Sequence, residues 1–80
     1  MQDFLNKTTI ELKIRNYSPK TVKSYLYALK EYFTFKKDNL EKLDIENIKN
    51  FLLQKQNQRA SPQTINLYLN AIKFFYREIA

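Results

Sequence analysis

Polar side chains of one kind recur along one side of the last helix that the sequence predicts. Asn66 and Asn70 stand one helical turn apart. At about 100° per residue, an arc of about 80° holds Gln63, Asn66, Asn70, Lys73 and Arg77. Asn and Gln amides fit an adenine edge with two hydrogen bonds, whereas Lys and Arg suit guanine or phosphate. Because Asn is a mediocre helix former, this stripe favours a binding role over a structural one.

A second polar stripe, richer in lysine, lies on an earlier predicted helix. Its members are Lys20, Lys23, Ser24, Tyr27 and Lys30. A stripe of lysines by itself is more often a solvated surface than a site. The alternative is a surface that binds the phosphates of a nucleic acid.

Both stripes lie on two near copies of one segment. The residues SPKTVKSYLYALK (18–30) return as SPQTINLYLNAIK (61–73), with seven of thirteen positions identical. Ser18 and Ser61 are expected to cap their helices, because a Ser hydroxyl accepts from a free N–H of the first turn and Pro fits the first helical position. Asp44 is expected to start a third helix in the same way.

The sequence predicts an all-α fold in one domain, residues 1–80. It contains no glycine and only two prolines, so hairpin turns lack their usual residues. The apolar periodicity predicts helices at 3–15, 19–35, 45–56 and 62–79. Their predicted core faces are Phe4, Leu5, Thr8 and Leu12; Val22, Tyr25, Leu26, Leu29, Tyr32 and Phe33; Ile45, Ile48, Phe51 and Leu52; and Ile65, Tyr68, Leu69, Ile72, Phe75, Tyr76 and Ile79.

The net charge is +6, and it is unevenly placed. Residues 18–37 carry five lysines against one acid, and residues 59–77 carry three cations and no acid. Residues 38–50 carry four acids against two lysines. The positive charge therefore follows the repeated segment, which favours a polyanion as partner.

Composition excludes several kinds of chemistry. The chain has no Cys and no His, which excludes a thiolate zinc site, a disulfide and a nucleophile paired with histidine. The carboxylates are scattered, so we expect no catalytic residue, metal or cofactor. No apolar run approaches the ~18 residues of a membrane span, and the N-terminus does not resemble a secretory signal. We expect a soluble cytoplasmic protein, associated with the nucleoid, that makes no membrane contact.

Four apolar residues fall outside the predicted core stripes: Ile10, Ile14, Leu67 and Phe74. The favoured interpretation is a wider core contact. The functional alternative is docking onto another domain or subunit, because grouped apolar residues on a surface mark interfaces.

The stretches RNYSPKTVKSYLYALKEYFTF and SPQTINLYLNAIKFFYREI resemble the N-terminal core-binding, SAM-like domain of tyrosine recombinases, the phage, integron and Xer-type integrases. The resemblance covers about residue 3 to Ala80. It implies four helices in two crossed pairs that form half of a clamp around duplex DNA. The second and fourth helices would approach the major groove, and the first and third would lie away from it, partly for contacts between protomers.

Carried onto this chain, the resemblance and the two stripes predict DNA contacts by Ser18, Lys20, Thr21, Lys23, Ser24, Tyr27, Lys30, Arg59, Ser61, Gln63, Thr64, Asn66, Asn70, Lys73 and Arg77. Expected partners are double-stranded DNA, the catalytic domain of a parent chain and other recombinase protomers, the last through Ile10, Ile14, Leu67 and Phe74.

The chain is not expected to be an enzyme. The family's catalytic domain supplies two Arg, a His or Lys set and a nucleophilic Tyr, and this sequence stops where that domain would begin. The alternative function is a helical module for protein–protein interaction. Added salt separates the two, because DNA binding weakens steeply with salt and apolar docking does not.

Overall fold

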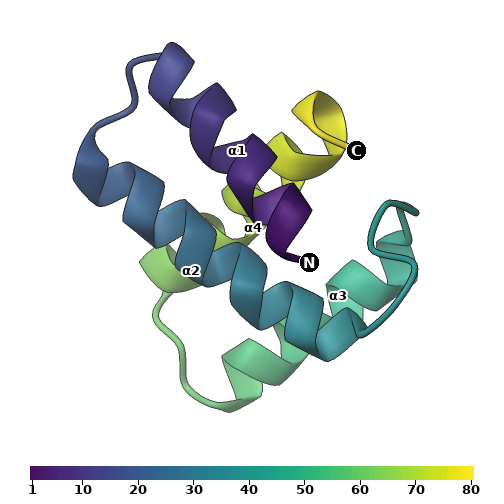
Figure 1. Ribbon diagram of the computed structural model, residues 1–80. Helices are drawn as coiled ribbons and strands as arrows, with labels where there is room; N and C mark the ends of the chain where they lie inside the picture. The colour runs from purple at the N-terminus through teal and green to yellow at the C-terminus, as the bar shows by residue number, and fades with distance from the viewer.

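The computed structural model describes all 80 residues and contains four helices and no strand. The helices are α1 (Gln2–Ile14), α2 (Pro19–Lys36), α3 (Ile45–Asn57) and α4 (Pro62–Glu78) (Figure 1). Each bound lies within one residue of its prediction, so the all-α fold is confirmed. α1 packs on α2, α3 packs on α4, and α2 and α4 make the most extensive contact, where the two pairs cross. None of the four helices is long and apolar enough to cross a membrane.

Three helices begin at the side-chain caps that the sequence predicts. Ser18 Oγ and Ser61 Oγ each accept a hydrogen bond of 3.2 Å, from the backbone N–H of Thr21 and of Thr64. Asp44 Oδ1 accepts one of 3.1 Å from the N–H of Asn47. Each bond satisfies an N–H that the helix itself leaves unpaired, and such a cap typically stabilises a protein by about 1 kcal/mol.

Helices α1 and α3 end in the same turn, built without glycine. Asn16 and Arg59 follow the two C-caps with φ of 62° and 66°. The N–H of Tyr17 then donates to Leu12 O, and the N–H of Ala60 donates to Lys55 O, both at 3.1 Å. This pattern is a Schellman motif, whose left-handed residue is usually Gly. Both turns lead directly into the Ser-Pro starts of α2 and α4.

The repeat extends over the whole chain. α3 starts 43 residues after α1 (45 − 2), α4 starts 43 residues after α2 (62 − 19), and α1 and α3 both have 13 residues. Buried positions coincide at this offset: Leu5 with Ile48, Thr8 with Phe51, Ala28 with Ala71, Leu29 with Ile72, and Tyr32 with Phe75. The chain therefore consists of two copies of one helical pair.

Contacts between the two copies are reciprocal. Tyr32 of the first copy donates its hydroxyl to Asn47 Oδ1 of the second at 2.7 Å. The residues at the equivalent positions, Phe75 and Phe4, stack edge to face with ring centroids 5.3 Å apart. Exchanging the copies maps one contact onto the other, so an approximate twofold axis relates them.

A second reciprocal pair differs in chemistry between the copies. Lys55 Nζ lies 3.0 Å from Glu31 Oε1 and over the rings of Phe51 and Tyr68, at 5.4 and 5.7 Å from their centroids. The equivalent residues in the other copy, Leu12 and Phe74, are buried in one apolar cluster. On one side of the axis, Lys55 therefore covers the edge of the core, where the other side has buried apolar side chains.

The core differs from the predicted faces at a few positions. Ile45, predicted to be buried, is 54% exposed, because it occupies the first turn of α3 beside an open surface groove. Leu40 and the alanines Ala28 and Ala71, outside the predicted stripes, are buried. The half-buried Ile65 and Leu69 lie at the rims of surface grooves. The remaining predicted core residues are buried or partly buried.

Because several tyrosines are buried, we expect the protein to lose stability cooperatively at high pH. Burial raises the pKa of Tyr68 to about 12, and it also raises the pKa of Tyr25, Tyr32 and Tyr76 above the ordinary value of 10.0. Because the unfolded chain ionises these groups more readily, the stability they contribute is complete below pH 10 and is lost as the pH rises toward 12.

We expect the free energy of unfolding to be level between about pH 7 and 9 and to fall steeply above about pH 10. Denaturant titrations at a series of pH values, with tyrosinate absorbance recorded in parallel, check this. Ionisation of all tyrosines near pH 10 without unfolding would contradict it.

Candidate nucleic-acid interface

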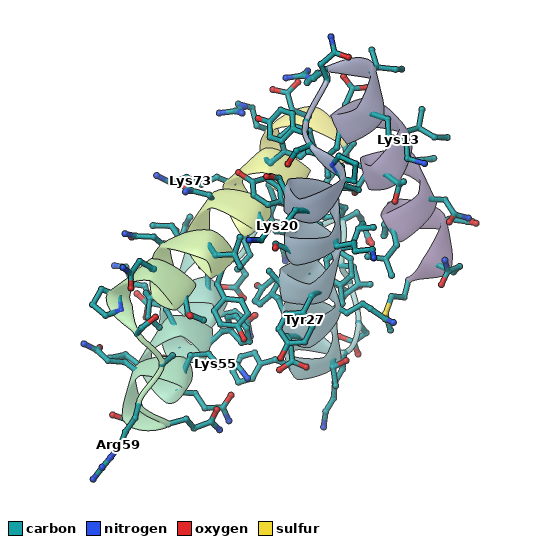
Figure 2. All side chains as sticks on the ribbon, turned by 90° about the vertical axis from the view of Figure 1, so that its left-hand side faces the viewer. Lys13, Lys20, Tyr27, Lys55, Arg59 and Lys73 are labelled. Atoms are coloured by element: carbon teal, nitrogen blue, oxygen red, sulfur yellow. The ribbon has the colours of Figure 1, made fainter.

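The first half of the candidate interface is the outer face of α2. Lys20, Lys23, Tyr27 and Lys30 are all exposed there, and Tyr27 exposes 57% of its surface. In Figure 2, Lys20 and Tyr27 project from α2 on the side facing the viewer, whereas Lys13 lies on α1 to the right. The ion pairs of the molecule are made by Arg15, Lys55 and Arg77 with Glu11, Glu31 and Glu78. Lys20, Lys23 and Lys30 on this face of α2 make no ion pair and are therefore free to meet an anion.

The second half is the outer face of α4, which carries amides. Gln63, Asn66, Asn70 and Lys73 are exposed, and Lys73 projects from α4 away from α2 (Figure 2). The side-chain hydrogen bonds of α4 are made by its cap, Tyr76, Arg77 and Glu78. The three amides keep their donors and acceptors for a ligand.

The two faces occupy equivalent positions of the two copies. At the offset of 43 residues, Lys20 corresponds to Gln63, Lys23 to Asn66, Tyr27 to Asn70 and Lys30 to Lys73. One surface is thus presented twice, once mainly with ammonium groups and once mainly with amides. Ammonium groups suit phosphate, and amides suit the edges of bases.

The predicted hydroxyl residues lie at the starts of these helices. Ser18 and Ser61 are exposed, and each Oγ lies 3.0 Å from the hydroxyl of Thr21 or Thr64. Thr21, Thr64 and Ser24 are half-buried. The hydroxyls of Ser18, Thr21, Ser61 and Thr64 already serve the helix caps, and Ser24 is half-buried within α2, so all five are secondary candidates for contact with a ligand.

Two predicted cations differ from the rest of the set. Arg59 extends from the α3–α4 connection at one end of the molecule (Figure 2), apart from Lys20 and Tyr27. Arg77 Nε donates to Glu78 Oε2 at 2.7 Å. Hydrogen bonds from Arg77 and then from Arg15 lower the pKa of the Glu78 carboxyl. The pairing leaves Lys73 as the better placed unpaired cation of α4, which sequence alone did not indicate.

Of the four apolar residues proposed for docking, two remain candidates. Ile10 and Ile14 are 58% and 70% exposed on α1. Phe74 is only 2% exposed, so the favoured interpretation of a wider core contact is confirmed for it and the docking alternative is wrong. It packs with Leu12 and Val22, because α4 is covered by α1 as well as by α2 and α3. Leu67 is half-buried against the main core cluster.

Comparison with known proteins gives a family match over nearly the whole chain. The profile of the phage integrase N-terminal SAM-like domain matches residues 4–80. Neither the search of curated proteins nor that of solved structures returned a match. The matched range contains all four helices except the first two residues of α1, and it contains both polar faces.

Proposed function

Because this chain belongs to the phage integrase N-terminal SAM-like domain family, we propose that it binds duplex DNA for an integrase during site-specific recombination. The observation that carries the proposal is the pair of equivalent exposed faces on α2 and α4, one of ammonium groups and one of amides. Asn66 and Asn70, on consecutive turns, lower the helix propensity of α4 and make no structural hydrogen bond in return. The net charge of +6 favours the same polyanion.

The α2 face contacts the DNA backbone, and the α4 face contacts the bases. Lys20, Lys23 and Lys30 contact phosphates, which fix the position of the helix but read no sequence. Asn66 and Asn70 are short and stand one turn apart, so their amides are held near base edges when α4 enters the major groove. The N-terminal turns of α2 and α4 add backbone N–H groups that favour phosphate.

The domain acts as half of a clamp, and the chemistry belongs to a catalytic domain of the parent chain. No residue of this chain is proposed to cut or join DNA. Ile10 and Ile14, exposed on α1 away from the two faces, are proposed to contact a neighbouring protomer on the same DNA.

The test compares Asn70→Ala with Lys73→Ala. Asn70→Ala is expected to lower the preference for the native site by about 1 to 3 kcal/mol and to leave binding to random duplex nearly unchanged. Lys73→Ala is expected to weaken both by a similar factor. The measurement is a pair of titrations, with specific and random DNA, at one salt concentration, in the full-length integrase.

Gln56→Ala on α3 is the matched control, because it removes an exposed amide away from both faces. An Asn70→Ala variant that weakens both DNAs equally, or neither, would show that this amide reads no base. The α4 face would then be a solvated surface.

A further inference from the structure

An apolar groove lies between α3 and α4. Its volume is about 530 Å³, and seven of its ten lining residues are hydrophobic. α3 contributes Ile45, Ile48 and Leu52, and α4 contributes Leu69, Ile72 and Tyr76. The three polar lining residues are all cations, Lys49, Lys73 and Arg77, and no carboxylate lines the groove.

The pair α1 and α2 differs from α3 and α4 at several of the positions that line the groove. At the offset of 43 residues, Ile45, Lys49, Leu52 and Arg77 correspond to Gln2, Asn6, Thr9 and Thr34. The fold therefore places small or neutral polar residues at these positions in one copy and apolar or cationic residues in the other. Packing of α3 on α4 does not require these apolar and cationic residues, since α1 packs on α2 without them.

Exposure of the apolar residues indicates a partner. Ile45 is 54% exposed and the neighbouring Leu43 is also 54% exposed. Both leave apolar surface in water beside a groove, which is characteristic of interaction sites.

We propose that this groove binds an acidic amphipathic helix of a protein partner. From Ile45 to Leu52 the wall extends seven residues, or about 10 Å, which matches the spacing of the i, i+4 and i+7 anchors of a bound helix. The apolar anchors fill the groove. Carboxylates beside them meet the unpaired Lys49 of α3 and Lys73 of α4, whereas Arg77 at the rim is already paired with Glu78.

The partner helix and DNA would both contact Lys73. An acidic helix in this groove covers a cation of the candidate DNA interface, so partner and duplex compete. The groove thereby offers a means of regulating DNA binding. This consequence rests on the proposed function, whereas binding of the helix itself does not.

The first experiment titrates the isotope-labelled chain with a synthetic helical peptide of about four turns, bearing leucines on one face and glutamates elsewhere. A peptide of the same composition with its leucines spread around the helix is the control. We expect micromolar binding of the first peptide, with NMR shift changes confined to α3 and α4, and at least tenfold weaker binding of the second.

Two chain variants locate the site. Ile45→Glu puts a carboxylate at the groove and suits the first turn of a helix, so the fold is retained. Lys49→Glu reverses a rim charge. Both are expected to weaken the first peptide at least tenfold. Lys13→Glu, which reverses an exposed charge on α1, is expected to leave peptide binding unchanged.

Equal binding of the two peptides, or an Ile45→Glu variant that binds as well as the parent chain, would overturn the proposal. So would saturation of the groove by decanoate without binding of the peptide, which would assign it to a small anionic amphiphile. No DNA is present in these titrations, so their failure leaves the proposed DNA binding untouched.

Discussion

Replacing Lys20, Lys23 and Lys30 together by Gln is expected to lower the affinity for duplex DNA by about 500-fold near 0.1 M salt. Each phosphate contact contributes about 0.9 to the slope of log K against log salt, so three contacts contribute about 2.7; with their contribution taken as zero at 1 M salt, the loss at 0.1 M is about 500-fold. The three side chains are exposed and unpaired, and Gln retains their helix propensity. The fold is therefore expected to survive the change.

The measurement is binding of one duplex at several salt concentrations by the parent and the triple variant. Replacing Lys7, Lys13 and Lys42 by Gln is the matched control, since it removes the same charge from exposed positions outside both faces. Equal losses in the two variants would mean that net charge, and not the α2 face, attracts the DNA. An unchanged slope in the first variant would place the phosphate contacts elsewhere.

Phe75→Ala is expected to cost about 3 to 5 kcal/mol of stability. The ring is fully buried, and its centroid lies 5.3 Å from that of Phe4, 4.9 Å from that of Phe33 and 4.9 Å from that of Tyr76. The loss is a large part of the about 4 to 12 kcal/mol typical of a chain of this length. Much of the variant is therefore expected to be unfolded at moderate temperature.

Denaturant unfolding followed by circular dichroism measures the loss. Tyr27→Ala also removes an aromatic ring, but one that is largely exposed, and its cost is expected to stay near 0.5 kcal/mol or below. Similar costs for the two variants would refute the central place of Phe75 in the core. Phe75→Leu is expected to recover part of the lost stability, because it refills some of the cavity.

The helices were predictable because their starts are encoded locally. Ser18, Asp44 and Ser61 each bond to an N–H three residues ahead, so the signal lies within one turn of chain. The outer stripes of α2 and α4 were predictable for the same reason, since the position of a residue around a helix follows from counting. All of their lysines and amides proved to be exposed.

What the sequence missed depends on contacts between distant segments. Phe74 is buried because α1 covers α4, and Arg77 pairs with a carboxylate that also holds Arg15, 63 residues from it. Ala28 and Ala71 carry too little apolar surface to stand out in a hydrophobic pattern, yet both are fully buried. α1 and α3 share no identical residue among 13 aligned positions, so only geometry shows that they are equivalent.

The packing of α4 also determines when during synthesis the protein can fold. This last helix supplies Tyr68, Ala71, Ile72, Phe74 and Phe75 to the core and contacts the first helix through Phe4. At about 5 to 20 residues per second a ribosome needs roughly 4 to 16 s for 80 residues. Until α4 is made, the apolar faces of the helices already synthesised lack the surface that buries them. Until α4 has emerged from the ribosome, chaperones can bind these exposed apolar faces, and any product truncated before α4 is a substrate for proteolysis.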